Sequence, residues 1–244
     1  MISRQRAERD ASLAGRASRR WRDVQPVVVR AAQTTIPTVW GTFQVIGYEE
    51  KVSHHVHLAL VLGDVADGQP VLLRPHSECL TGDVFGSQRC DCQAQLHLAM
   101  RTVGEEGRGV ILYLRQEGRG VGLINKLRAY ALQDQGLDTV DANLHLGLPV
   151  DQRDYGIAYQ ILADLGINKL RVLSNNPRKY DGLTAYGVEV TEHLPLVTKP
   201  TVHNARYLST KRERLGHLLD PMTRAPSDGV DGALPPVAGG ADLG

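Results

Sequence analysis

Residues 71–114 read VLLRPHSECLTGDVFGSQRCDCQAQLHLAMRTVGEEGRGVILYL, and this stretch decides the fold class. It opens with a short apolar strand over residues 71–74 and then passes through a polar segment that carries every cysteine of the chain. Apolar residues recur at helical spacing over residues 93–103, and the apolar run over residues 109–114 is typical of a buried strand. A strand, a helix and a strand in this order predict an α/β protein.

The rest of the chain continues this alternation. Upstream, β-branched runs broken by turn residues predict strands over residues 25–31, 39–47 and 57–62. Downstream, a helix is expected after Gly118 and Gly120, and the remaining segments are a helix over residues 155–165, a strand over 169–173, a helix over 177–186 and a strand over 188–192. We therefore expect one α/β domain over residues 25–219, with a single mixed sheet and helices packed on it.

The composition is that of a globular protein. Of 244 residues, 42% are hydrophobic and 23% are charged, and the formal net charge is +1. A charge so close to zero excludes a basic surface over the whole chain, so we expect no nucleic-acid partner and a local site for any anion. No stretch approaches the roughly 18 consecutive apolar residues of a membrane span, and no apolar block typical of an export signal stands at the N-terminus. The sequence therefore predicts a cytoplasmic protein without a membrane partner.

The two ends of the chain differ from this globular part. Residues 1–24 are rich in Arg and show almost no apolar periodicity, which predicts a flexible arm. An organelle transit peptide is the alternative, and Glu8, Asp10 and Asp23 count against it. Residues 220–244 are rich in Gly and Pro, which predicts a disordered tail.

The three cysteines, Cys79, Cys90 and Cys92, lie within one short window. An odd number of cysteines in a chain without an export signal does not indicate a disulfide scaffold, whereas thiolates gathered in one window favour a soft metal, and zinc fits best. Three thiolates leave a fourth position open for water, which is typical of a catalytic site. The alternative is a closed structural site in which His76 or His97 supplies the fourth ligand.

Two polar turns at expected helix starts are candidates for phosphate binding. Residues 115–128 place three glycines among basic side chains, where backbone amides and Arg119 could hold an anion. The alternative for Lys126 and Arg128 is a solvated helix face. Residues 174–179 read SNNPRK and form a second such turn between a strand and a helix.

Residues 151–154 read DQRD and lie where a helix is expected to begin. Asp151 can serve there as an N-cap, a role worth about 1 kcal/mol. It could also hold the guanidinium of Arg153 and remove its proton, but residue chemistry alone favours the cap.

Together these segments resemble GTP cyclohydrolase II, the zinc enzyme that opens riboflavin biosynthesis. The resemblance covers about residues 34–219 and rests on the motifs HSECLTGD, RCDCQAQL, RQEGRGVGLINKLRAYALQDQGLDTVDAN, DQRDYGIA and SNNPRKY. It implies the family's α/β fold, a homodimer, and a hydrolase that converts GTP to 2,5-diamino-6-ribosylamino-4(3H)-pyrimidinone 5′-phosphate, formate and pyrophosphate. The cofactors it implies are one Zn²⁺ per chain and Mg²⁺ bound with the GTP triphosphate.

The resemblance also implies roles for individual residues. Zinc would be held by Cys79, Cys90 and Cys92, with water in the fourth position. Asp151 would accept a proton from Arg153, the nucleophile at the α-phosphorus, and Tyr130 would act in the release of formate. The GTP contacts would be Arg74, Pro75, His76, Ser77, Glu78, Gln95, Glu117, Gly118, Arg119, Thr139, Ser174 and Lys179.

The sequence is also consistent with two other functions. One is a variant cyclohydrolase, in a specialised pathway, that stops at the formamidopyrimidine nucleotide; Tyr130 favours the complete reaction over this one. The other is a non-catalytic, zinc-stabilised nucleotide-binding protein. Such a binder has no need of an open metal site together with Asp151, Arg153 and Tyr130.

Overall fold

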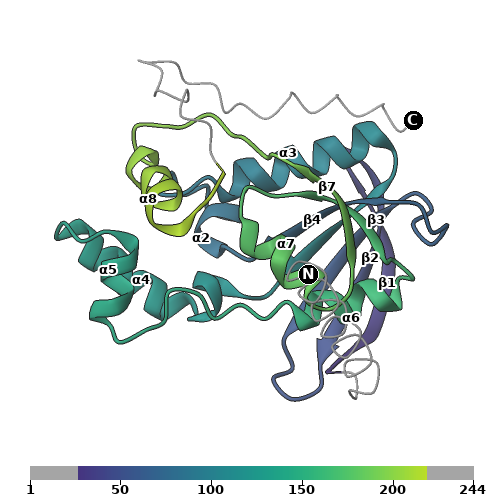
Figure 1. The fold of residues 1–244 in the computed structure, drawn as a ribbon, viewed down its shortest axis with the longest axis horizontal. Helices are drawn as coiled ribbons and strands as arrows, with labels where there is room; N and C mark the ends of the chain where they lie inside the picture. The colour runs from purple at the N-terminus through teal and green to yellow at the C-terminus, as the bar shows by residue number, and fades with distance from the viewer. Residues whose placement is uncertain (1–26, 219–244) are drawn as a thin grey trace, which may run out of the picture.

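The fold is built on one mixed seven-stranded sheet in the order β1-β2-β3-β5-β4-β6-β7 (Figure 1). The computed structural model describes residues 27–218, so the arm predicted over residues 1–24 and the tail predicted over residues 220–244 lie outside the described residues. The strands are β1 (Val28–Thr38), β2 (Gly41–Glu50), β3 (Val56–Leu62), β4 (Val71–Ser77), β5 (Gly109–Leu114), β6 (Lys169–Leu173) and β7 (Glu189–Leu194). Strands β1, β2, β3 and β5 pair antiparallel, and β5, β4, β6 and β7 pair parallel. The predicted α/β fold with a single mixed sheet is confirmed.

Helices cover both faces of the sheet because successive strand side chains point to opposite faces. Leu72 belongs to the apolar cluster beneath α3 (Cys92–Glu106). Its neighbour Leu73 belongs to the cluster beneath α6 (Gly156–Asp164) and α7 (Pro177–Thr184). Figure 1 shows α3 on one side of the strands and α6 and α7 on the other. The sheet is therefore the middle layer of three.

Strand β4 lies at the centre of the parallel half, with β5 on one side and β6 on the other. The connection from β4 leads to β5 on one side, and the connection from β5 leads back past β4 to β6 on the other side. Ligands of open α/β sheets bind at the carboxyl ends of the strands where the direction of the connections reverses in this way. The cysteine segment follows β4, the glycine-rich turn follows β5, and the polar turn of residues 174–176 follows β6. Helices α4 (Leu123–Asp134), α5 (Thr139–His145) and α8 (Ala205–Leu215) extend beyond this edge of the sheet (Figure 1).

The first hairpin differs from its prediction. The strands expected over residues 25–31 and 39–47 are β1, which continues to Thr38, and β2, which begins only at Gly41. Val39 and Trp40 form the turn between them, where the Thr38 hydroxyl accepts a hydrogen bond from the Trp40 amide at 3.2 Å and donates one to the Gly41 carbonyl at 2.8 Å. The extent of β1 was missed because nearly all its residues are exposed, which leaves no alternation of apolar and polar residues.

Four short or hydrophilic helical segments were not predicted. They are α2 (Leu80–Asp83), the 3₁₀ turn η1 (Glu117–Gly120), α5 and α8. Helix α5 begins at an N-cap, Asp138, whose carboxylate accepts hydrogen bonds from the amides of Val140 and Asp141. A cap of this kind fixes a helix of two turns that carries too few residues for an apolar period.

Candidate active site

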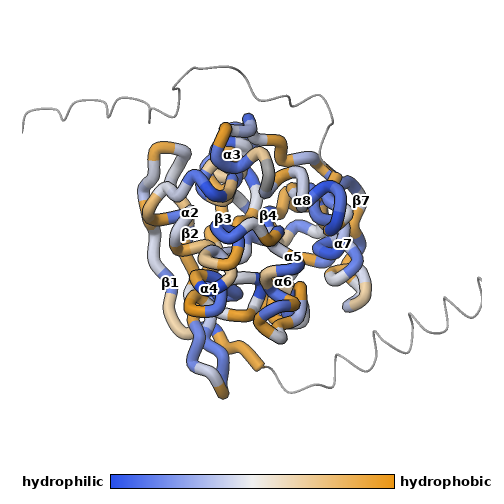
Figure 2. The backbone as a smooth tube through the Cα atoms, turned by 90° about the vertical axis from the view of Figure 1, so that its left-hand side faces the viewer, coloured by the Kyte–Doolittle hydropathy of each residue, from blue (hydrophilic) through white to orange (hydrophobic). Residues whose placement is uncertain are grey.

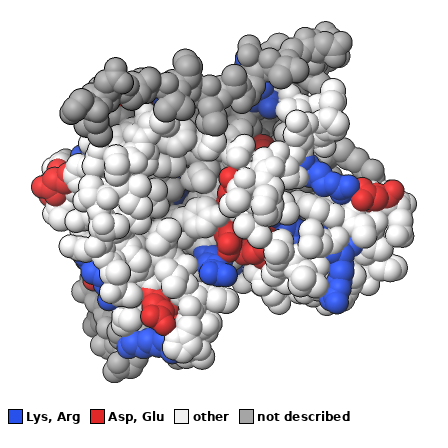
Figure 3. Space-filling model, turned by 180° about the vertical axis from the view of Figure 1, so that it is seen from behind, with Lys and Arg blue, Asp and Glu red and all other residues white. Residues whose placement is uncertain are grey.

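An open cavity lies where the parallel strands end. Its walls come from the segments that follow β4, β5 and β6, and from α4, α5 and α8. In the view from behind, acidic and basic side chains lie side by side near the middle of the molecule, and no continuous basic surface covers that face (Figure 3). The face in this view therefore offers no extended basic surface for an anion.

The three cysteines form one group at the N-terminus of α3. Their sulfurs all lie within 4.8 Å of one another, and those of Cys79 and Cys90 are 3.7 Å apart. Zn–S bonds of about 2.3 Å in tetrahedral geometry place sulfurs roughly 3.8 Å apart, so the group fits a zinc ion. A Cβ atom added at Gly82 would lie 2.8 Å from the Cys90 sulfur and 3.1 Å from that of Cys79. The loop that carries Cys79 can approach the other sulfurs only because residue 82 is Gly.

Neither histidine proposed as a fourth ligand belongs to this group. Within residues 27–218, the residues that can hold a metal together are the three cysteines alone. The His76 Nε2 atom contacts the Asp83 carboxylate at 3.0 Å, and the His97 ring packs against Trp40 with centroids 5.0 Å apart. The described residues therefore do not support the closed Cys₃His alternative.

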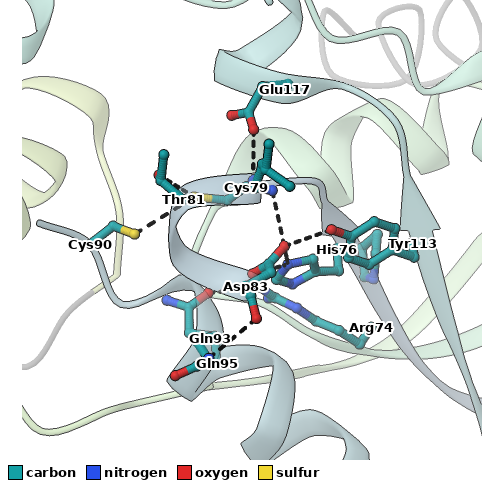
Figure 4. Close-up of polar contacts among 12 residues, drawn as sticks. Arg74, His76, Cys79, Thr81, Asp83, Cys90, Gln93, Gln95, Tyr113 and Glu117 are labelled. Carbon is teal, nitrogen blue, oxygen red and sulfur yellow. Dashed lines mark hydrogen bonds and ion pairs between the residues drawn. The ribbon is translucent and has the colours of Figure 1, made fainter. Parts of the chain in front are cut away.

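Asp83 holds the loop that carries Cys79. Its carboxylate accepts hydrogen bonds from the Cys79 amide at 3.0 Å and from the Tyr113 hydroxyl at 2.9 Å, in addition to the contact with His76 (Figure 4). Glu117 adds a bond from the other side, because its Oε2 atom accepts from the Leu80 amide at 2.7 Å. The first cysteine is thus fixed by residues from β4, β5 and the glycine-rich turn.

Lys126 lies against the cysteine group, and its interpretation as part of a solvated face is wrong. Its Nζ atom is 3.0 Å from the Cys79 sulfur and 2.8 Å from Glu117 Oε1, and its side chain is 11% exposed. Arg128, by contrast, is exposed and contacts Asn125, as a solvated face predicts. Hydrogen bonds from the other two thiols, together with the Lys126 charge, lower the pKa of Cys79, whereas its thiolate raises the pKa of Cys90 to about 11. The Lys126 charge beside Cys79 therefore favours a thiolate in this group.

Most of the predicted nucleotide contacts meet in this cavity. Its walls include Arg74, His76, Ser77, Glu78, Gln95, Glu117, Gly118, Arg119, Thr139, Ser174 and Lys179. Pro75 does not line it; its carbonyl accepts a hydrogen bond from the Lys179 ammonium inside the protein. Three buried polar atoms at the end of β4, Arg74 Nε, His76 Nδ1 and Ser77 Oγ, have no hydrogen-bond partner among the described residues. Buried polar atoms without partners mark the wall where a polar ligand fits.

The far wall of the cavity concentrates positive charge. Arg74 and Lys179 are each about 95% buried, and burial lowers the pKa of both, that of Arg74 to about 10. Repulsion from Arg74, Arg153 and Lys211 lowers the pKa of Lys179 further. Burial, together with the charges of Lys211, Arg119 and Arg153, lowers the pKa of His217 to about 3. Cations held this close together without enough acidic partners are suited to a polyanion such as a triphosphate.

Asp151 is not a helix cap. Helix α6 begins at Gly156, and the amide of Gly156 is bonded by Asp154 instead. The Asp151 carboxylate forms a bidentate ion pair with Arg153, with Nε at 2.9 Å from Oδ1 and Nη2 at 2.5 Å from Oδ2. Burial raises the pKa of Asp151, but the hydrogen bonds and charge of Arg153 outweigh it, and the net pKa is lowered. Asp151 is therefore ionised, which is the state a proton acceptor needs.

Arg153 and Tyr130 line the cavity, while Asp151 lies behind Arg153 in a small adjoining hollow. Burial lowers the pKa of Arg153 and the hydrogen bonds to Asp151 raise it above its usual value. Burial raises the pKa of Tyr130 to about 12, although the Lys126 charge opposes it. The phenol stays protonated at neutral pH and can donate a hydrogen bond.

The sequence did not identify several residues of the site. They are Gly82, Asp83, Asp91, Lys126, Tyr207, Lys211 and His217. Gly82, Asp83 and Asp91 lie between Cys79 and Cys92, and this position between expected metal ligands could have identified them from the sequence. Tyr207, Lys211 and His217 come from α8 and the residues after it, far along the chain, and only the fold brings them to the cavity.

The fold and the site define an α/β protein in which a three-cysteine metal group adjoins a cationic cavity at the ends of parallel strands. Residues 29–195 match the model of the GTP cyclohydrolase II family, and the chain belongs to this family. The resemblance that the motifs indicated is confirmed. Among the residues described, no helix is long and apolar enough to cross a membrane.

Curated relatives share more than half of their residues with this chain where they align. The riboflavin biosynthesis protein RibBA of Bacillus mycoides (strain KBAB4) is 58% identical over 196 residues, which are 80% of this chain and 49% of that protein. RibBA of Bacillus cytotoxicus (strain DSM 22905 / CIP 110041 / 391-98 / NVH 391-98) is 58% identical over 193 residues, with 79% and 49% covered. The chain thus spans about half the length of the curated relatives it matches.

A solved structure also matches, at low similarity. It is the crystal structure of RibBX, a two-domain 3,4-dihydroxy-2-butanone 4-phosphate synthase from A. baumannii, at 24% identity over 76% of this chain and 44% of that chain. The TM-score is 0.42, at which the likeness carries no argument about this protein.

Proposed function

We propose that this protein hydrolyses GTP to 2,5-diamino-6-ribosylamino-4(3H)-pyrimidinone 5′-phosphate, formate and pyrophosphate, the first step of riboflavin biosynthesis. One observation carries the proposal: the three cysteine sulfurs and the Arg153 guanidinium line the same cavity. A reaction that opens a purine ring and also cleaves a triphosphate needs metal chemistry and phosphorus chemistry within reach of one nucleotide. Membership of the GTP cyclohydrolase II family and the riboflavin role of the Bacillus relatives support the same substrate.

We assign the phosphorus chemistry to Arg153 and Asp151. Two nitrogens of the guanidinium are bound by Asp151, and Nη1 makes no hydrogen bond within the described part of the chain, so we assign Nη1 as the nitrogen that meets the α-phosphorus. The N–P bond forms as the bond from that phosphorus to the bridging oxygen breaks, pyrophosphate leaves, and the proton lost by the guanidinium passes to Asp151. Water later cleaves the N–P bond and restores Arg153.

The cysteines Cys79, Cys90 and Cys92 fit Zn²⁺, which would supply Lewis-acid activation of water for opening the imidazole ring at C8 and for removing the formyl group. We assign Mg²⁺ to the triphosphate of the bound GTP. Tyr130 is the donor placed to stabilise charge on the formamide, because its phenol is protonated and lines the cavity beside Cys90.

The unpartnered atoms of Arg74, His76 and Ser77 are the groups we assign to binding the nucleotide. Lys179 and Arg119 add positive charge for the phosphates, with Glu78, Gln95, Glu117, Gly118, Thr139 and Ser174 completing the walls. Pro75 acts only through its carbonyl, which orients Lys179. We further propose residues 25–219 as the catalytic domain and a homodimer as the assembly; the cytoplasmic location stays a prediction from the sequence.

The direct test is to incubate the purified, metal-loaded chain with GTP and Mg²⁺ and to assay formate and pyrophosphate separately. Equal release of both supports the full reaction, with metal-stripped protein as the control that should release no formate. Pyrophosphate without formate would identify the variant that stops at the formamidopyrimidine nucleotide. If a folded, metal-loaded chain releases neither formate nor pyrophosphate, the non-catalytic nucleotide-binding alternative remains.

A further inference from the structure

Helix α8 forms one side of the cavity although it lies beyond residues 29–195, the part that matches the family model. Tyr207 and Lys211 of α8, and His217 just after it, line the cavity. The helix has the sequence ARYLSTKRERL and is strongly hydrophilic (Figure 2). Its buried side chains, among those described, are the polar Thr210 and Lys211. Apolar burial therefore does not explain how α8 is held in place.

Polar contacts attach α8 at three points on the rim of the cavity. Lys211 Nζ lies 2.7 Å from Asp91 Oδ1, between two of the cysteines. Arg214 pairs with Asp138 and with Asp141 at the start of α5. After the helix, the Leu218 amide donates to the Asn175 carbonyl at 2.8 Å, in the polar turn that follows β6.

The contact with Asp91 differs from the other two because both partners are buried. The Lys211 side chain is 9% exposed and that of Asp91 is 3% exposed. Gln95 Nε2 donates to the second carboxylate oxygen of Asp91 at 2.5 Å, and Gln95 Oε1 accepts from Arg74 at 2.7 Å. Charged groups this deeply buried are stable only when paired, so the loss of one partner leaves an uncompensated charge.

Asp91 also sets the direction of the cysteines on either side of it. Its backbone has φ −108° and ψ 15°, a compact conformation that curls the chain. Cys90 and Cys92 can turn toward one metal only with such a curl, because neighbours one residue apart in an extended strand point the same way but lie about 6.6 Å apart. Asp91 is the residue at this curl, and its side chain is the one that Lys211 contacts from α8.

We propose that Lys211 is a positioning residue that joins α8 to the cysteine loop, so that metal binding and closure of the cavity by α8 are coupled. The metal favours the curled loop, the curled loop presents Asp91 to Lys211, and Lys211 docks α8 over the cavity. Coupling of this kind is reciprocal: an undocked α8 weakens metal binding, and loss of the metal loosens α8. The inference rests on the metal site of the proposed function but not on turnover.

The test compares the full-length wild-type chain with Lys211→Met, Lys211→Met/Asp91→Asn, and Arg212→Met as a matched control. Arg212 is the next residue of α8, its side chain is 43% exposed, and its partner Glu213 lies in the same helix. Zn²⁺ affinity is measured by competition with a chromophoric chelator, and amide hydrogen exchange of residues 205–215 is followed with and without Zn²⁺. Circular dichroism and thermal unfolding establish that each variant is folded.

In Lys211→Met we expect zinc affinity to fall about 10- to 100-fold, the range typical of residues that orient metal ligands. Arg212→Met should stay within about twofold of wild type, and the double variant should bind zinc nearly as weakly as Lys211→Met, because removing the unpaired Asp91 charge does not restore the link to α8. Zn²⁺ should slow exchange of α8 in the wild-type chain and have little effect in either Lys211 variant.

Wild-type zinc affinity in a folded Lys211→Met chain, or α8 exchange that ignores Zn²⁺ in the wild-type chain, would overturn the inference. Absence of tight zinc binding in the wild-type chain would overturn both this inference and the metal assignment. Absence of GTP turnover in a zinc-loaded chain would overturn the proposed function alone.

Discussion

The ammonium of Lys126 lies 3.0 Å from the sulfur of Cys79 and 2.8 Å from a carboxylate oxygen of Glu117. Three thiolates around a divalent ion carry one more negative charge than the ion neutralises. The positive charge of Lys126 offsets that excess at Cys79. The ion pair with Glu117 holds the Lys126 ammonium in this position. The glycine-rich turn is thus connected to the cysteine group as well as to the cavity.

Replacing Lys126 by Met should weaken zinc binding about 10- to 100-fold, because the positive charge beside the Cys79 sulfur is lost and Glu117 keeps an unpaired charge nearby. The measurement is competition for Zn²⁺ with a chelator at neutral pH. Arg128→Met, an exposed position on the same helix, is the control and should bind zinc normally. Unchanged zinc affinity in a folded Lys126→Met chain would show that the contact is incidental.

Gly82→Ala should disrupt the metal group more than the fold. The added methyl group would lie 2.8 Å from one cysteine sulfur and 3.1 Å from another, so the loop must move away from the other ligands. We expect zinc content after dialysis to drop to a small fraction of wild type. Gly104→Ala provides the contrast, because the three atoms nearest its added methyl group all belong to Trp40, so that this variant should lower the melting temperature while zinc stays bound.

The quoted segment predicted the centre of this fold correctly because a buried parallel strand and an amphipathic helix both have strong apolar periods. Strands β4 and β5 and helix α3 appear where residues 71–114 place them. Helix α8 has no such apolar period. Its position depends instead on the contact between Lys211 and Asp91, which lie 120 residues apart in the sequence. The cysteines were found from spacing alone, but the role of Lys126 was not, because helical spacing gives no sign of what a lysine faces.

Arg153→Lys should abolish pyrophosphate release, by at least about 10³-fold, while zinc stays bound. A lysine keeps the charge but cannot form the bidentate pair with Asp151 that aims the guanidinium at the cavity. Pyrophosphate is assayed enzymatically and zinc by metal analysis. Arg178→Met removes an arginine whose Nη1 atom lies 3.7 Å from Asp151 and whose side chain is 58% exposed, and this variant should retain most of the activity. Pyrophosphate release at the wild-type rate in Arg153→Lys would remove Arg153 from the mechanism.

His57 should make the stability of the sheet depend on pH. The Arg115 amide donates to its Nδ1 at 3.0 Å, so its Nε2 carries the proton and donates to Glu50 at 2.8 Å. Burial lowers the pKa of His57 below 6.5, and the contact with Glu50 raises it by less. The unfolded chain therefore takes up a proton first as the pH falls, so the contribution of His57 is full above about 6.5 and is lost below it.

The corresponding measurement is chemical denaturation of wild type and His57→Gln at pH 7.5 and pH 5. The stability difference between the two proteins should be larger at pH 7.5 and should shrink at pH 5, since only the wild type loses the histidine contribution. His55→Gln, with a side chain that is 53% exposed, is the control and should follow the wild type at both pH values. A difference that grows toward pH 5 would contradict the assigned direction of the shift.

Tyr130 separates the full reaction from one that stops at the formamide. Burial raises the pKa of its phenol to about 12, so the phenol is a proton donor throughout the neutral range. A hydrogen bond from this group to a formamide oxygen strengthens as negative charge develops on that oxygen, and such a bond lowers the barrier of that step more than it stabilises the bound intermediate. The loss of the hydroxyl should therefore slow one step and leave the others nearly unchanged.

Removing one donor of this type typically costs about 10²- to 10³-fold in rate, so Tyr130→Phe should accumulate the formamidopyrimidine nucleotide while pyrophosphate release continues at nearly the wild-type rate. Mass spectrometry of the products detects the retained formyl group directly. Tyr159→Phe removes a phenol that stacks on Tyr186, outside the cavity, and should form the complete product at the wild-type rate. If Tyr130 were only a packing residue of α4, its Phe variant would slow every step alike or none, and an active enzyme without the formyl intermediate would exclude the hydroxyl from deformylation.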